Sequence, residues 1–128
     1  MCWPEDYLDA HDRHWEDAEL LFQEGRLANA DHLYGLSAEC GLKAIWPGRE
    51  VERVHLDRGL WERFVEEYNA GNRPIPLTLP VENPFREWRI SHRYAARRCF
   101  TQEYVEEHRR AAEQVLLFVR EYRQGGLV

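Results

Sequence analysis

The sequence predicts an all-α fold, an antiparallel four-helix up-and-down bundle that forms a single domain over residues 1–128. Apolar residues recur every three or four positions in several stretches, which is the spacing of one side of an α-helix. Strand-like alternation is scarce, and the length suits one domain of about 100–150 residues. With 44% hydrophobic and 31% charged residues, the composition is that of a globular protein.

Two apolar stripes predict the first two helices. The first helix should begin near Pro4, a residue favoured in a first turn, and end at Gly25. The second should be capped by Asn29 and end at Pro47-Gly48. The stripes consist of Leu8, His11, Trp15, Ala18 and Phe22, and of Ala30, Tyr34, Ala38, Gly41 and Ile45.

Two features inside the second helix predict specific contacts. Gly35 and Gly41 would permit close approach of another helix, which would offset the cost of about 1 kcal/mol for each helical glycine. Glu39 and Lys43 are four positions apart and can therefore form an ion pair along the helix.

The second half of the chain predicts a short helix over residues 56–68 and a long final helix. Between them, residues 69–84 contain four prolines, which exclude a continuous helix and predict an irregular connection. The final helix should be capped by Thr101 and end at Gly125-Gly126. Its inner side should carry Tyr104, His108, Ala111, Val115, Phe118 and Tyr122.

No segment has the roughly 18 unbroken apolar residues of a membrane span, and the first residues lack the basic and apolar parts of a secretory signal. We therefore expect a cytoplasmic protein that does not associate with membranes. The cysteines lack the paired spacing of zinc or redox motifs, which predicts free thiols at Cys2, Cys40 and Cys99.

The charge is unevenly distributed. The net charge of −6 argues against a surface covered with phosphate-binding residues. Residues 86–98 nevertheless hold five arginines and one glutamate, a local charge of +4, so the remainder of the chain sums to −10. This basic patch has two interpretations, a phosphate-binding surface or an ion-pairing surface for the acidic body.

Residues 29–45 (NADHLYGLSAECGLKAI) and several later motifs carry a family resemblance. In residues 29–45 the likeness lies at Tyr34, Glu39 and Lys43-Ala44, and the order of the later motifs is His55-Leu56, Leu60-Trp61, Arg93-Tyr94-Ala95 and the alanine-bearing final helix. From about Trp15 to Tyr122 the chain resembles HEPN domains (higher eukaryotes and prokaryotes nucleotide-binding). The resemblance implies a four-helix bundle that pairs as a homodimer and binds or cleaves RNA or nucleotides. It also implies a toxin–antitoxin or nucleotidyltransferase-type partner, and no cofactor.

Many HEPN domains are metal-independent endoribonucleases that use an arginine and a histidine with four to six residues between them. Arg86 and His92 have that spacing. The resemblance therefore implies that His92 takes the proton of a ribose 2′-hydroxyl while Arg86 stabilises charge on the phosphate. The implied nucleic-acid-binding residues are Arg89, Arg93, Arg97 and Arg98 for phosphates, and Trp88 or Tyr94 for stacking on a base.

The local structure around this pair decides whether it can work. In a continuous helix that starts at Pro84 and is capped by Asn83, Arg86 and His92 would lie about 240° apart around the axis. Convergence would then need a break in the helix, or one residue from each subunit of a dimer.

Two other functions are open. A noncatalytic helical module could bind a protein or small ligand through an aromatic-rich surface that includes Trp3 and Trp46. A metal-binding bundle is the second alternative, since Glu52 and His55 have a Glu-x-x-His spacing, although such bundles need that element twice. The spacing of His11 and His14, one helical turn apart, would also suit a metal site. Histidines on an apolar stripe, such as His11 and His108, are however more often hydrogen-bonded residues of the core or of a dimer seam.

Overall fold

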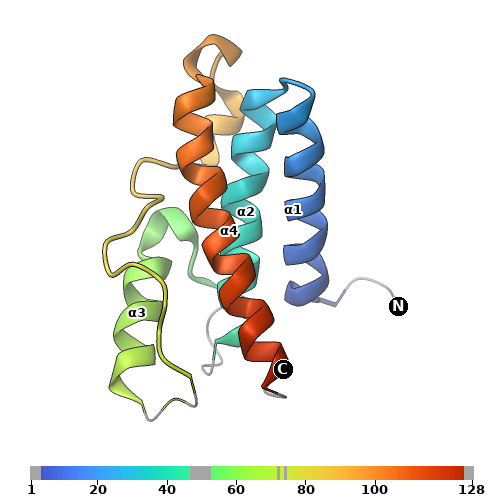
Figure 1. Ribbon diagram of the computed structural model, residues 1–128. Helices are drawn as coiled ribbons and strands as arrows, with labels where there is room; N and C mark the ends of the chain where they lie inside the picture. Colours follow the sequence, from blue (N-terminus) through green and yellow to red (C-terminus); the bar gives the residue numbers. More distant parts are fainter. Residues whose placement is uncertain (1–3, 47–52, 72, 74, 126–128) are drawn as a thin grey trace.

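The computed structural model describes residues 4–46, 53–71, 73 and 75–125. The described residues form α-helices and short 3-10 turns, and no β-strand occurs among them (Figure 1). None of their helices is both long enough and apolar enough to cross a membrane. The elements are α1 (Tyr7–Gln23), α2 (Leu27–Ile45), η2 (Leu56–Arg58), α3 (Leu60–Ala70), η3 (Ile90–Tyr94), η4 (Arg97–Cys99) and α4 (Gln102–Gln124).

The helix ends follow from local capping. Thr101 caps α4 as predicted, because its hydroxyl oxygen accepts a hydrogen bond from the main-chain nitrogen of Tyr104 at 3.1 Å. The predicted cap at Asn29 is wrong. The chain reverses at Gly25, whose φ is +74°, so α2 begins directly afterwards and Asn29 lies in its first turn. The predicted stop at Pro47-Gly48 lies outside the described residues.

The up-and-down topology is also wrong, although the four-helix, all-α prediction agrees with the structure. Asp31 and Gly41 of α2 lie near His108 and Val115 of α4, so these two helices run in the same direction, and α1 runs opposite to both, as in an up-and-down bundle. The departure is α3, which would run opposite to α2 and α4 in an up-and-down bundle but points the same way as both in Figure 1. The physical reason is the length of the connections over residues 46–59 and 71–101, which return the chain to the end where the previous helix began.

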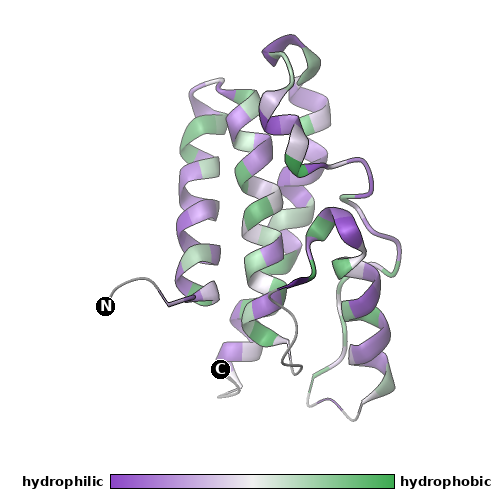
Figure 2. Cartoon of the chain, turned by 180° about the vertical axis from the view of Figure 1, so that it is seen from behind, coloured by the Kyte–Doolittle hydropathy of each residue, from purple (hydrophilic) through white to green (hydrophobic). Residues whose placement is uncertain are grey.

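A core of aromatic side chains joins α3 to α4. Phe64 and Tyr68 of α3 both contact the ring of Phe118, with centroid distances of 6.4 and 5.6 Å. The Nε1 atom of Trp61 donates a hydrogen bond to the main-chain oxygen of Pro80 at 2.9 Å, which holds the proline-rich connection against α3. Figure 2 shows that every helix carries both hydrophilic and hydrophobic residues along its length, as expected for helices with one buried side.

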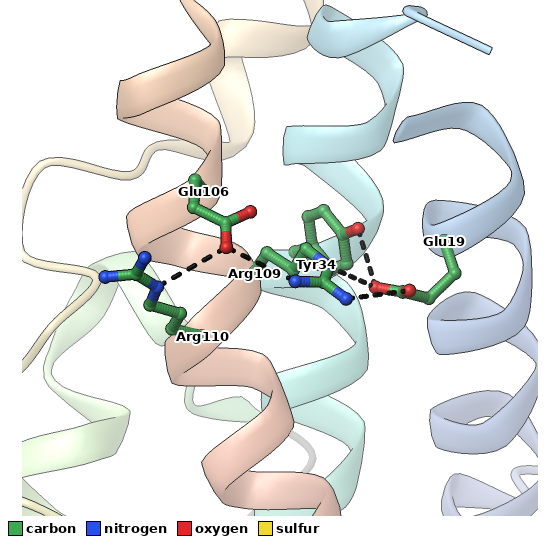
Figure 3. Close-up of polar contacts among 5 residues, drawn as sticks. All are labelled: Glu19, Tyr34, Glu106, Arg109 and Arg110. Carbon is green, nitrogen blue, oxygen red and sulfur yellow. Dashed lines mark hydrogen bonds and ion pairs between the residues drawn. The ribbon is translucent and has the colours of Figure 1, made fainter. Parts of the chain in front are cut away.

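A charged network joins α1, α2 and α4 (Figure 3). The carboxylate of Glu19 in α1 accepts hydrogen bonds from the hydroxyl of Tyr34 in α2 at 2.9 Å and from Nε of Arg109 in α4 at 2.7 Å. Arg109 and Arg110 also pair with Glu106 on their own helix. Burial and the bond to Glu19 raise the pKa of the Tyr34 hydroxyl, which therefore remains a hydrogen-bond donor.

Candidate nucleic-acid interface

The arginine-rich segment, residues 86–98, is anchored to α2 by the buried ring of Trp88. Its Nε1 atom donates a hydrogen bond to the main-chain oxygen of Asp31 at 3.1 Å, and the residue is 1% exposed. A Cβ atom at Gly35 would lie 2.1 Å from this ring. Close packing therefore occurs at Gly35 as predicted, but its partner is Trp88 and not another helix. At Gly41 the neighbours do come from helices, namely His11 of α1 and Val115 of α4.

The start of the segment is a turn. The side-chain oxygen of Asn83 accepts a hydrogen bond from the main-chain nitrogen of Phe85 at 2.8 Å, and the buried Phe85 ring stacks on His108. Turn residues 84–87 and the short elements η3 and η4 follow, so no continuous helix starts at Pro84. The 240° separation expected for such a helix does not apply.

Arg86 and His92 have different surroundings. The Nη1 atom of Arg86 lies 3.3 Å from Oε1 of Glu82, and Arg86 lines a pocket of about 220 Å³ together with Asp57. The His92 ring instead lies against Phe100, at a centroid distance of 6.5 Å. Among the described residues, no hydrogen bond joins the Arg86 and His92 side chains.

The two aromatic residues expected to stack on a base also differ. Trp88 is buried and its Nε1 atom is bonded, so its ring cannot stack on a base, and that expectation is corrected. Tyr94 is 78% exposed, and the guanidinium carbon of Arg93 lies 4.9 Å from its ring centroid. Tyr94 therefore keeps an accessible ring beside a positive charge.

All five arginines of the segment are exposed, but Arg89 also bonds to the main chain of the turn. The Nη1 atom of Arg89 donates hydrogen bonds to the main-chain oxygens of Arg86 and Trp88, at 2.7 and 2.9 Å, and so stabilises the turn. Arg93, Arg97 and Arg98 are exposed.

Arg93 and Arg97 line a pocket of about 330 Å³ at the start of α2, and a third arginine, Arg26, lines it from the helix cap. The pocket is also lined by the buried residue Phe100 and by Leu27, Ala28 and Asn29 of the first turn of α2. Arg26 lies far from residues 86–98 in the sequence. The only signal in the sequence that Arg26 could belong to a binding site is its position just before the second helix.

The electrostatics of this pocket favour an anion. None of the ion pairs among the described residues involves Arg26, Arg93 or Arg97. The ion-pairing interpretation of the basic patch therefore fits Arg86, which contacts Glu82, but not these three residues. A helix start adds main-chain N–H groups and the positive end of the helix dipole, and the cap residue Arg26 makes no side-chain capping bond.

A histidine lies between the arginine-rich segment and α2. The His32 ring stacks on Trp88, with centroids 6.1 Å apart, and its buried Nδ1 atom has no hydrogen-bond partner among the described residues. Burial, followed by the charge of Arg93, lowers the pKa of His32. This imidazole is therefore neutral at pH 7 and adds no charge to the patch.

Further along α2, Glu39 and Lys43 form the predicted ion pair, with Nζ 3.0 Å from Oε2. The sequence did not indicate that the same carboxylate also contacts His55, whose Nδ1 atom lies 3.1 Å from Oε2. Glu39 and His55 line a third pocket, of about 330 Å³, whose other walls are Leu36, Asp57, Arg58 and Ile90.

The histidines predicted to be core residues are confirmed as such. His11 is fully buried, and its Nδ1 atom lies 2.7 Å from the main-chain oxygen of Ser37. The Nδ1 atom of His108 lies 2.6 Å from Oδ1 of Asp31, again in the buried interior.

The described residues contain no group of three or more His, Cys, Asp or Glu side chains placed to hold a metal ion. Glu52, part of the Glu-x-x-His spacing, lies outside the described residues. Cys40 and Cys99 are free thiols as predicted, and Cys2 also lies outside. Burial, and then the charge of Glu39, raises the pKa of the Cys40 thiol to about 11.

An aromatic-rich binding surface receives little support from the described tryptophans. Trp61 and Trp88 are buried, while Trp15 and Trp46 are half-buried and pack against the core. Trp3 lies outside the described residues.

Comparison with models of known protein families, with curated proteins and with solved structures finds no significant match.

Proposed function

We propose that this chain binds RNA through the phosphate groups of the strand, with Arg26, Arg93 and Arg97 as the principal contacts. The observation that carries the proposal is the pocket at the start of α2, which is lined by these three arginines. None of the three forms an ion pair with a carboxylate among the described residues. Phosphate binding depends on such positive charges, since each one that meets a phosphate displaces a counterion.

The resemblance of residues 29–45 to HEPN domains supports the same proposal, because nucleotide binding is a property of that family. Free nucleotides are smaller ligands of the same phosphate-binding groups. The exposed ring of Tyr94, next to Arg93, offers a stacking surface for an unpaired base. Single-stranded RNA, whose bases are accessible, is therefore the expected substrate class.

The test is binding of a fluorescently labelled single-stranded RNA, measured by anisotropy at fixed salt. The variant Arg26→Gln/Arg93→Gln/Arg97→Gln should bind at least about tenfold more weakly than wild type. The matched control is Arg13→Gln/Arg63→Gln/Arg110→Gln, which removes the same charge from arginines that pair with carboxylates elsewhere. Equal weakening in the two variants would reject the pocket as the binding site.

Cleavage through Arg86 and His92 is the catalytic form of the proposal, as a metal-independent endoribonuclease. The Arg86 side chain contacts Glu82 and the His92 ring lies against Phe100, so an RNA strand would have to reach both surroundings for the two groups to act together. The test is RNA cleavage in the presence of a chelator by wild type, Arg86→Ala and His92→Ala. Equal activity of all three would reject the proposed roles.

Pairing as a homodimer, and association with an antitoxin or a nucleotidyltransferase-type protein, belong to the same proposal and derive from the family resemblance. Light scattering coupled to size-exclusion chromatography measures the mass directly. A monomer at all concentrations would reject the dimer, and with it any site shared between subunits.

A further inference from the structure

The pocket at the start of α2 collects positive charge from two distant parts of the chain. Arg26 lines it from the helix cap, and Arg93 and Arg97 line it from the arginine-rich segment. No Asp or Glu is among the described residues that line it. The pocket of about 220 Å³ beside it in the fold is different, because its lining includes Asp57 and Glu62. The pocket at the start of α2 is therefore suited to an anion.

The first turn of α2 adds main-chain donors to this pocket. Its lining includes Leu27, Ala28 and Asn29. The first nitrogen of the helix to donate a main-chain hydrogen bond is that of Ala30, to the oxygen of Arg26 at 3.0 Å. The nitrogens of the three lining residues donate to no acceptor in the described part of the chain, and this turn contains no acidic residue. These N–H groups are therefore available to the same anion that the arginines attract.

The size of the pocket favours the end of a strand over its middle. The volume of about 330 Å³ lies at the lower end of the range of about 300–1,000 Å³ that is typical of small-ligand pockets. One side of the pocket is the buried residue Phe100. A space of this size accommodates one phosphate with its nucleotide, not several nucleotides of a continuous strand.

The donors in the pocket match a phosphate monoester better than a diester. A phosphate inside a strand carries a single negative charge and two non-bridging oxygens. A monoester carries about 1.5 to 2 negative charges at pH 7 and has three acceptor oxygens. The three arginines and the free N–H groups supply more positive charge and more donors than one diester can use.

Arg93 connects the pocket to an accessible aromatic ring. Its guanidinium carbon lies 4.9 Å from the ring centroid of Tyr94, which is 78% exposed. A base attached to a phosphate in the pocket can therefore stack on Tyr94. The strand that follows would continue along the arginine-rich segment.

We infer that this pocket binds the terminal phosphate monoester of a single-stranded RNA. Arg26 and the first turn of α2 recognise the additional charge of the end, while Arg93 and Arg97 also attract the phosphates that follow. The inference rests on the proposed function, which supplies the RNA, and it defines the class of RNA end that is preferred.

The experiment compares three single-stranded RNAs of one sequence, each with a fluorophore at an internal base. They end in a 5′-phosphate, in a 3′-phosphate, or in hydroxyl groups at both ends. Anisotropy at fixed salt measures their affinity for the full chain. At least one phosphorylated RNA should bind about tenfold or more tightly than the hydroxyl RNA, as expected for one or two additional hydrogen bonds to a charged group.

Two arginine variants test whether the preference arises in the pocket. Arg26→Gln should bring the affinities for phosphorylated and hydroxyl RNA close together. Arg98→Gln is the matched control, because Arg98 is an exposed arginine of the same segment that is not among the residues lining the pocket. It should weaken all three RNAs alike and keep their ratio. A ratio that changes equally in the two variants would overturn the assignment to the pocket.

Asn29→Asp separates loss of the ligand from loss of the fold. The new carboxylate would stand in the pocket wall and repel the phosphate, so the preference for a phosphorylated end should disappear. The same carboxylate would interact favourably with the helix dipole, so the Tm should rise or stay unchanged. A preference that survives in the folded variant would contradict the inference.

An unlabelled nucleoside 5′-monophosphate distinguishes the end of a strand from a free nucleotide. It should displace the phosphorylated RNA only at concentrations well above the Kd of that RNA, because it lacks the phosphates that follow. Displacement at concentrations close to that Kd would overturn the strand end as the ligand.

The two proposals fail in different ways. Equal binding of all three RNAs by wild type would overturn the terminal-phosphate inference and leave RNA binding intact. No binding of any of them would overturn the proposed function and this inference together.

Discussion

The Nδ1 atom of His108 lies 2.6 Å from the Oδ1 atom of Asp31, and this contact joins the parallel helices α2 and α4 inside the core. The side chains are 4% and 1% exposed. The main-chain oxygen of the same aspartate accepts the hydrogen bond from Trp88, so Asp31 contacts both α4 and the arginine-rich segment.

Removing one member of this pair should be costly. Asp31→Ala would leave a buried imidazole without its hydrogen-bond partner, and we expect the free energy of unfolding to fall by about 1–3 kcal/mol. Urea unfolding checks this, with Glu107→Ala at an exposed position next to His108 as the control. A loss for Asp31→Ala no larger than that of the control would show that the pair does not stabilise the fold.

Gly35→Ala should destabilise the contact between α2 and the arginine-rich segment. The new methyl group would meet the Trp88 ring at 2.1 Å, and overpacking of this kind costs about 1–3 kcal/mol. Asn29→Ala, at an exposed position of the same helix, should be nearly neutral. Thermal unfolding of the two variants distinguishes packing from helix propensity. An increase in stability for Gly35→Ala would mean that the Trp88 ring does not lie there.

The stability of the fold should fall in acid because of buried histidines. Burial is the main cause that lowers the pKa of His11 below 6.5, and the pKa values of His14 and His32 are lowered in the same direction. Below pH 6.5 the unfolded chain therefore binds more protons than the folded one. The free energy of unfolding should fall as the pH drops from 6.5 and level off below the folded pKa values.

Urea unfolding at pH 7 and pH 5 measures this difference, which should be smaller in His11→Gln than in wild type. An NMR titration in which His11 takes up its proton at pH 6.5 or above would contradict the expectation.

The tyrosine hydroxyl in the charged network should make a measurable contribution. Tyr34→Phe removes the hydrogen bond to Glu19 but keeps the ring, and we expect a loss of about 1 kcal/mol in the free energy of unfolding. Tyr94→Phe provides the matched control, since Tyr94 is 78% exposed. Equal stability of the two variants would indicate that the Glu19 bond contributes nothing net.

The parts of the fold that depend on local residue spacing were predictable from the sequence. The stripe that includes His108 and Val115 identified the buried side of α4, and Thr101 identified its start. The relative direction of the helices was not predictable in this way, because it depends on where the long connections return the chain. Neither the proline spacing nor the apolar pattern contains that information.

The site was predictable only in part for a similar reason. The basic segment is evident from charge alone, but the approach of Arg26 to Arg93 results from the packing of Trp88 against Gly35. The ion pair of Glu39 and Lys43 is local and was predicted, whereas the contact of Glu39 with His55 spans 16 positions and depends on tertiary structure.

The most direct test of phosphate binding is the salt dependence of RNA affinity. For a single strand, the logarithm of affinity falls with the logarithm of salt concentration by about 0.7 for each phosphate neutralised. If Arg26, Arg93 and Arg97 each neutralise one phosphate, the wild-type slope should be steeper by about 2 than that of the triple glutamine variant. Identical slopes for the two proteins would contradict the account.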